Sequence, residues 1–278
     1  MRTRTVRRRA LHAAGSCIAV MLLAGGCSSS GTAASGSAAS GSASAASSTA
    51  SAVTGTVAVF AAASLQESFL QIGRQFEAAR PGTKVVFNFA GSNSLAAGIV
   101  GEAPADVFAA AGPATMKTVT DKGEAAGTPK IFVRNQLETA TAPGNPQHVA
   151  GLQDLTRPGL KVVLCAREVP CGAASQTVLN AANIQLTPVS YEQDVKAALT
   201  KVELQEADAS LVYRTDVKAA AGKVDGVNFP EASSAVNDYP ITPLTHAPNA
   251  AGARSFVAYV ESPDGQKVLT DAGFLPAT

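Results

Sequence analysis

Histidine and serine are the side chains here that could support hydrolysis or hold a metal, and few of them are placed for either. Three histidines occur in 278 residues. His12 lies in the export segment described below, which leaves His148 and His246. Neither has a metal-ligand spacing such as HxxxH, and both lie among Pro, Asn and Gly in expected loops. No GxSxG elbow, P-loop or GxGxxG motif occurs. The sequence therefore favours a protein that is not an enzyme, with a hydrolase using Ser64 and His246 as the remote alternative.

Cys165 and Cys171 are the second candidate pair. Thiols of exported proteins usually pair, and the CxxxxxC spacing allows the roughly 4.4–6.8 Å between Cα atoms that a disulfide requires. We predict a disulfide. The alternatives are two small buried apolar side chains, or a metal site that no neighbouring histidine supports.

The positions at which an expected strand ends and a helix begins are the more informative candidates for a binding site. Ser64-Leu65-Gln66-Glu67 predicts an S-x-x-E capping box, and Gly91-Ser92-Asn93-Ser94 and Pro170-Cys171-Gly172-Ala173 are rich in small residues. Asp194 is the expected N-cap of a fourth helix, which begins at Val195. The first N–H groups of a helix lack intrahelical partners and together carry about half a positive charge. Several such ends meeting at one cleft would bind an anion without Lys or Arg, whereas each alone is an ordinary cap.

Alternating apolar strands and amphipathic helices must position these junctions. This βαβ order predicts an α/β protein with mostly parallel sheets covered by helices. Strands are expected at 56–61, 84–89, 106–109, 160–164, 210–213 and 227–229, and helices at 64–79, 92–101, 172–182, 193–202 and 216–221.

The order of these elements indicates two lobes. Two extended stretches, 131–140 and 238–244, bracket a central block of about 100 residues. The segment 255–260 and a helix after Pro263 would return to the first lobe. The expected division is lobe I at 55–135 and 240–278 and lobe II at 136–239, joined by two crossing strands as in proteins that close about a hinge.

The N-terminus has the order of an export signal. Five arginines precede Ala10, a 14-residue apolar run follows, and the run Ala24-Gly25-Gly26-Cys27 resembles a bacterial lipoprotein cleavage site. We expect a signal at 1–26, a lipidated Cys27 at the outer face of the membrane, and a Ser/Gly/Ala tether at 27–54. Ordinary signal cleavage without lipid is the alternative.

Charge excludes two classes of protein. Residues 10–66 contain no Asp, Glu, Lys or Arg, and five of the 22 basic residues precede them. Loss of the signal leaves 17 basic against 21 acidic residues, a net charge of −4. That balance excludes an overall basic nucleic-acid binder. The apolar run is shorter than the roughly 20 residues of a membrane span, which argues against a polytopic membrane protein.

Short motifs along the folded part resemble those of the molybdate-binding proteins that serve ABC importers. In the first lobe these motifs are Val57-Ala58-Val59-Phe60-Ala61-Ala62-Ala63-Ser64-Leu65, Phe89-Ala90-Gly91-Ser92 and Ala103-Pro104-Ala105-Asp106-Val107-Phe108. In the second they are Val169-Pro170-Cys171-Gly172, Asp194-Val195 and Leu211-Val212-Tyr213. The resemblance runs from about Val57 to Gly273-Phe274, and its first-lobe motifs are the more specific.

The resemblance implies a two-lobed periplasmic-binding-protein fold with an oxyanion site between the lobes. Ser64 and Ser92 would donate from lobe I through hydroxyl and backbone N–H groups. The backbone N–H groups of Cys171 and Val195 and the phenol of Tyr213 would donate from lobe II. The implied ligand is molybdate or tungstate without any cofactor. The implied partner is an ABC permease that a monomer serves, with the membrane reached only through the lipid.

Three residues depart from the family pattern. Cys171 stands where relatives have alanine, which a backbone contact tolerates unless a disulfide distorts the loop. Gly91 and Asn93 replace residues of a Ser-rich loop and leave fewer hydroxyls there.

The chemistry of the implied site discriminates between anions. Molybdate, tungstate and sulfate are fully deprotonated at neutral pH and accept hydrogen bonds only, whereas phosphate retains a proton that needs an acceptor. None of the five implied positions is acidic, which disfavours phosphate. The alternative is a binding protein of the same fold for sulfate, thiosulfate or a small organic anion.

Overall fold

The computed structural model describes residues 53–278. The predicted signal, the lipidated Cys27 and the tether up to residue 52 lie outside the described residues. Within 53–278, no helix combines the length and the apolar character needed to cross a membrane.

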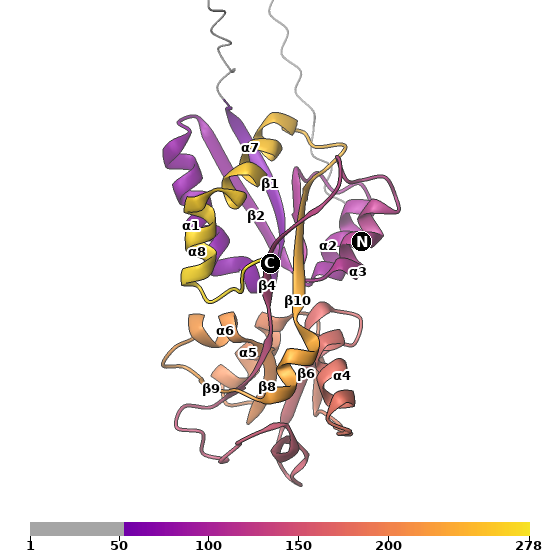
Figure 1. The fold of residues 1–278 in the computed structure, drawn as a ribbon, viewed down its shortest axis with the longest axis vertical. Coiled ribbons are helices and arrows are strands. Elements are labelled where there is room, and N and C mark those ends of the chain that lie inside the picture. The colour runs from indigo at the N-terminus through magenta and orange to yellow at the C-terminus, as the bar shows by residue number, and fades with distance from the viewer. Residues whose placement is uncertain (1–52) are drawn as a thin grey trace, which may run out of the picture. The chain divides into compact units, whose positions relative to one another are not determined.

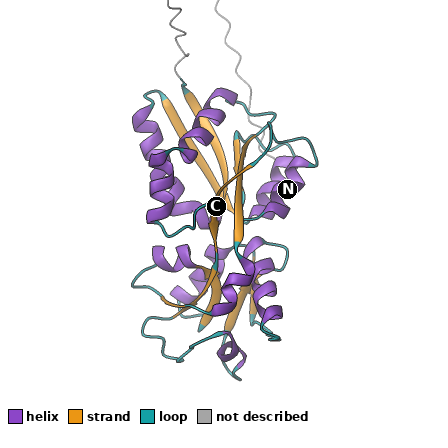
Figure 2. Ribbon diagram, viewed as in Figure 1, coloured by secondary structure: helices purple, strands orange, loops and turns teal. Residues whose placement is uncertain are grey.

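Two five-stranded sheets form the framework (Figure 2). The first has the order β2-β1-β3-β10-β4 and the second β7-β6-β8-β5-β9. Only β10 runs against the first sheet and only β5 against the second, so both sheets are mixed but mostly parallel. The predicted two-lobed α/β class is confirmed. The strands are β1 (Gly55–Ala62), β2 (Thr83–Ala90), β3 (Val107–Ala109), β4 (Lys130–Asn135), β5 (Leu137–Thr141), β6 (Val162–Cys165), β7 (Ser190–Glu192), β8 (Ala209–Tyr213), β9 (Asp225–Val227) and β10 (Asn237–Pro243).

Helices cover both sheets (Figure 1). In the first lobe α1, α7 and α8 lie on one side of the sheet and α2 and α3 on the other. In the second, α4 and α5 pack against β6 and β8, and α6 packs against β8 and β5. The helices are η1 (Ala63–Leu65), α1 (Gln66–Ala79), α2 (Ser92–Val100), α3 (Pro113–Thr120), η2 (Leu152–Thr156), α4 (Pro170–Ala181), α5 (Val195–Glu203), α6 (Arg214–Ala219), η3 (Pro230–Ala235), α7 (Ala250–Glu261) and α8 (Pro263–Asp271).

Apolar periodicity determines how the first lobe packs. Along α1, Phe69, Ile72 and Phe76 recur at helical spacing, and all three are fully buried. Phe256 of α7 packs edge-on against Phe69 and Phe76, with ring centroids 6.0 and 5.3 Å apart. This packing holds α1 on the sheet, and the start of α1 beside the end of β1.

The lobes are connected by strands that pass between them. β4 ends at Asn135 in the first sheet and β5 begins at Leu137 in the second, so Gln136 alone separates them. β10 returns beside β4, where Asn237 pairs with Asn135 (Figure 1). The expected extended stretches thus exist, although the first one is divided between two sheets.

Several elements differ from the sequence prediction; β7 and η2, for example, were not expected. Helix α3 was not expected, although Pro113 at its first turn is a typical start signal. The strand expected at 227–229 lies at Asp225–Val227. Phe229 is buried because it precedes Pro230 at the start of η3, rather than because it continues a strand.

Candidate functional site

A small cavity lies where the two lobes meet, and all five residues expected to bind the anion line it. These residues are Ser64, Ser92, Cys171, Val195 and Tyr213. The cavity is small: its accessible volume of about 20 Å³ is little more than the space that holds one water molecule. The structure therefore brings together residues that are up to 149 positions apart in the sequence.

Three helix N-termini converge on this cavity. Ser92 is the first residue of α2, Cys171 the second of α4 and Val195 the first of α5. The first residue of α4 whose N–H donates to a backbone carbonyl is Ala173, and in α5 it is Ala198. The N–H groups of Cys171 and Val195 come earlier and have no partner among the hydrogen bonds of residues 53–278. The starts of α2, α4 and α5 thus lie at one cavity, and the binding of an anion by these helix ends stays a prediction.

Ser92 presents its hydroxyl as a donor. Its side chain is 1% exposed, and Oγ accepts the N–H of Ala111 at 3.0 Å. A hydroxyl that accepts still has one proton to donate. Within the described part of the chain that proton has no acceptor, so it is available to an oxyanion in the cavity.

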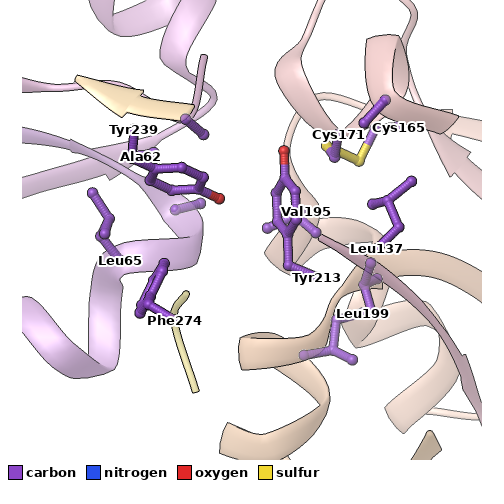
Figure 3. Packing of buried hydrophobic residues seen from close by; sticks show 14 of the residues in the cluster. Ala62, Leu65, Leu137, Cys165, Cys171, Val195, Leu199, Tyr213, Tyr239 and Phe274 are labelled. Carbon is purple, nitrogen blue, oxygen red and sulfur yellow. A yellow bond between two sulfur atoms is a disulfide. The ribbon is translucent and has the colours of Figure 1, made fainter. Parts of the chain in front are cut away.

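Tyr213 is held in the same way from the second lobe. It ends β8, is 1% exposed, and its Oη accepts a bond from Asn237 Nδ2 at 3.0 Å. Burial raises the pKa of the phenol well above its usual value, so the phenol stays protonated at neutral pH. Figure 3 shows this ring opposite Tyr239 of the first lobe, and the two rings meet edge-on at 5.9 Å.

Ser64 corrects one sequence prediction. It was expected to cap α1 as part of a capping box with Glu67, but it lies inside η1, and neither η1 nor α1 has a side-chain cap. Its Oγ lies 2.9 Å from Tyr239 Oη instead. Because the chain turns through η1 before α1 begins, the hydroxyl faces the cavity and the Tyr239 phenol rather than the helix end.

The loop before α4 carries the cysteine pair. Cys165 and Cys171 are joined by a disulfide, with Cα atoms 5.8 Å apart. Gly172 follows, and a Cβ there would collide with the backbone of Ala166. The absence of a side chain lets the loop fold tightly against the start of α4, so that the backbone of Cys171 reaches the cavity wall.

Charged groups stand beside the cavity. Asp194 is the N-cap of α5, as predicted, and its Oδ1 accepts the N–H of Ala197 at 2.9 Å. Lys196 Nζ lies 2.9 Å from Glu67 Oε2 of the other lobe and 3.0 Å from Asp216 Oδ1. Burial alone would lower the pKa of Lys196, but the two carboxylates outweigh it and raise that pKa. Burial likewise raises the pKa of the fully buried Asp216, and Lys196 opposes this only in part.

Ser64 and His246, the pair of the hydrolase alternative, do not line the same cavity. His246 is exposed and lines a separate cavity with Glu102 and Glu124, whereas Ser64 lines the one between the lobes. His148 is exposed in a loop, with a positive φ of 51°. Across residues 53–278 no group of three or more His, Cys, Asp or Glu side chains is placed to hold a metal.

Sequence reasoning missed two residues of this site. Ala111 follows β3 and supplies its peptide group to the site, and Asn237 at the start of β10 donates to both Ala111 and Tyr213. Ala111 gave no signal, since its backbone makes the contacts. Asn237 lies one position before the crossing stretch that was expected at 238–244.

Comparison with known proteins indicates the family. Residues 57–275 match the family model described as "Bacterial extracellular solute-binding protein". The molybdate-binding protein ModA of Mycobacterium tuberculosis (strain H37Rv) is 47% identical over 219 residues, which cover 79% of this chain and 84% of that relative.

Two solved structures resemble the fold. The periplasmic molybdate-binding protein of Azotobacter vinelandii has a TM-score of 0.67 at 19% identity and covers 79% of this chain and 98% of its own. The sulfate-binding protein SubI of M. tuberculosis has a TM-score of 0.68 at 19% identity and covers 80% and 86%. At this identity each comparison shows the fold alone.

Proposed function

The chain belongs to the bacterial extracellular solute-binding proteins, and from that membership we propose that it captures molybdate outside the cytoplasm and delivers it to an ABC importer. Tungstate, which has the same charge and shape, would bind as well. The protein acts as a binding protein rather than as an enzyme, and it works as a monomer without a cofactor.

The observation that carries this proposal is a cavity lined mainly by groups that can donate hydrogen bonds. Ser92 and Tyr213 each accept one hydrogen bond from the protein and keep a proton for the ligand. The N–H groups of Cys171 and Val195 lie at the ends of α4 and α5, and Ser64 adds a third hydroxyl. The one carboxylate on the wall, Asp194, accepts the N–H of Ala197 in its own helix through Oδ1. Such a site fits an anion that carries no proton.

Both lobes contribute donors, so we propose that the ligand draws them together. Ser64 and Ser92 lie beside the first sheet, and Cys171, Val195 and Tyr213 beside the second. The full set of donors exists only when the lobes approach, so a bound anion favours that arrangement. The proposed hinge lies at the two crossings, one at Gln136 and the other just before Asn237, where β10 begins.

We also propose that Cys27 is lipidated after export and that residues 27–54 tether the folded part to the outer face of the membrane. The support is the order of the N-terminal sequence: arginines, a short apolar run, small residues and then Cys27. Mass spectrometry of the membrane fraction, with Cys27→Ala as the comparison, tests this point. A Cys27→Ala protein that stays in the membrane fraction as the wild type does would contradict it.

Substitution of the two hydroxyl donors tests the assignment of the site. Ser92→Ala and Tyr213→Phe should each weaken molybdate binding by about 1–3 kcal/mol, because a buried oxyanion oxygen loses its donor. The matched controls are Ser94→Ala, an exposed serine on the same helix, and Tyr191→Phe, a 44% exposed tyrosine. Isothermal titration gives the affinities. Wild-type affinity in both site variants would show that the anion binds elsewhere.

A further inference from the structure

We infer that Asn237 is a positioning residue that makes Tyr213 a hydrogen-bond donor to the bound oxyanion. This inference rests on the proposed function of the cavity. Asn237 does not line the cavity itself. Its Nδ2 donates to Ala111 O at 2.8 Å and to Tyr213 Oη at 3.0 Å.

The orientation of the Asn237 amide follows from the chemistry of its partners. The Ala111 carbonyl can only accept a hydrogen bond, so the amide nitrogen, rather than the amide oxygen, must face it. The second proton of that nitrogen then points at Tyr213. The Tyr213 oxygen therefore accepts, and its own proton must be donated elsewhere. Tyr213 forms part of the cavity wall, so its proton can be donated into the cavity, where a bound anion competes with the neighbouring Tyr239 as the acceptor.

The same network determines the direction of the Ser92 hydroxyl. The N–H of Ala111 donates to Ser92 Oγ at 3.0 Å, while the carbonyl of Ala111 accepts from Asn237. The oxygens of both hydroxyls are thus supplied with protons by the protein. Toward the ligand each hydroxyl therefore acts as a donor, and the proton of an anion such as hydrogen phosphate would have to compete for an oxygen that already accepts a bond. Asn237 thereby contributes to selectivity without touching the ligand.

Asn237 also links the direction of the Tyr213 hydroxyl to the approach of the two lobes. Ala111 follows β3 of the first sheet, and Tyr213 ends β8 of the second. The two bonds from one nitrogen exist only when both lobes stand as in this structure. Tyr213 is therefore fixed as a donor in the arrangement that completes the site.

A double-mutant comparison on the purified protein tests the inference. Asn237→Leu removes both donated protons and should weaken molybdate binding roughly 3- to 12-fold, the range for one lost hydrogen bond. In a Tyr213→Phe background the same change should alter the affinity less than about 2-fold, because the group on which Asn237 acts is gone. Val236→Leu, at the exposed neighbouring position, is the matched control.

The outcomes are distinct. Equal losses from Asn237→Leu in the two backgrounds would overturn the inference, since Asn237 would then act through Ala111 or the fold. Wild-type affinity for molybdate in Asn237→Leu would also overturn the inference. Asn237→Ala repeats the comparison, and the unfolding temperature of each unliganded variant identifies any that fails to fold. A wild-type protein that does not bind molybdate would instead refute the proposed function.

Discussion

Replacing Gly91 with alanine is expected to weaken ligand binding without weakening the fold. Gly91 is the N-cap of α2 and has φ −58° and ψ 134°, a conformation that alanine adopts without strain. A Cβ at this position would lie closer than 3.0 Å to the backbone oxygen of Gln193, which belongs to the other lobe. Its contact with Asn93 Oδ1 can be relieved by rotation of that side chain. The clash therefore acts between the lobes.

The size of the effect follows from the displacement that the clash requires. Restoring ordinary contact with Gln193 separates the lobes locally by about 1 Å, and Val195 stands only two residues further on. A donor at about 2.9 Å from the anion would move to about 3.9 Å, beyond hydrogen-bonding distance. The loss of one charge-assisted bond costs about 1.5–3 kcal/mol, or roughly 10- to 150-fold in affinity.

Isothermal titration with molybdate measures this loss, and thermal unfolding of the unliganded protein checks the fold. The unfolding temperature should stay level or rise slightly, because alanine restricts the unfolded chain more than glycine does. Gly112→Ala is the matched control, since a Cβ there would meet Pro170 of the other lobe at an ordinary 3.7 Å. It should leave the affinity within about 2-fold of the wild type. Wild-type affinity in Gly91→Ala would refute the reasoning, because the lobes would then not need this contact to bind the ligand.

Three further predictions concern the protonation and the stability of the site. Molybdate affinity should vary less than about 2-fold between pH 6.5 and 9.5, because the raised pKa of Tyr213 keeps its phenol protonated over this range. A steep fall in affinity by pH 9.5, measured by titration, would contradict this. Lys196→Met should lower the free energy of unfolding by about 3 kcal/mol, because it leaves the fully buried Asp216 without a counter-charge. Glu67→Gln changes a side chain that is 49% exposed, so it should lower the free energy of unfolding by less than about 1 kcal/mol. Urea unfolding compares the two variants, and equal losses would show that burial does not decide the cost. Reduction of the disulfide that closes the loop before α4 should cost about 2 kcal/mol of stability and leave the molybdate-induced rise in unfolding temperature in place. Disappearance of that rise would mean that the disulfide shapes the site.

Local sequence patterns were sufficient to predict most elements of the fold. The apolar spacing of α1 and the alternation along β1 were visible directly, since both depend on which face of an element is buried. The Asp194 cap was predictable because capping is local. Helix α3 escaped because its apolar face is short, although Pro113 marked its start.

Long-range contacts explain what the sequence did not show. Ser64 has the spacing of a capping residue, but its hydroxyl meets Tyr239, 175 positions away. Asn237 and Ala111 are 126 positions apart, and no local pattern links them. The resemblance to a family, rather than any periodicity, indicated that Ser64, Ser92 and Tyr213 belong to one site.

A titration of the purified protein with molybdate, tungstate, sulfate and hydrogen phosphate tests the central claim most directly. Isothermal calorimetry at neutral pH should show one site for molybdate and for tungstate. Both anions should raise the unfolding temperature, while sulfate and hydrogen phosphate at the same concentration should not. Absence of binding by both metal oxyanions, or binding of hydrogen phosphate as tight as that of molybdate, would contradict a site built mainly of donors.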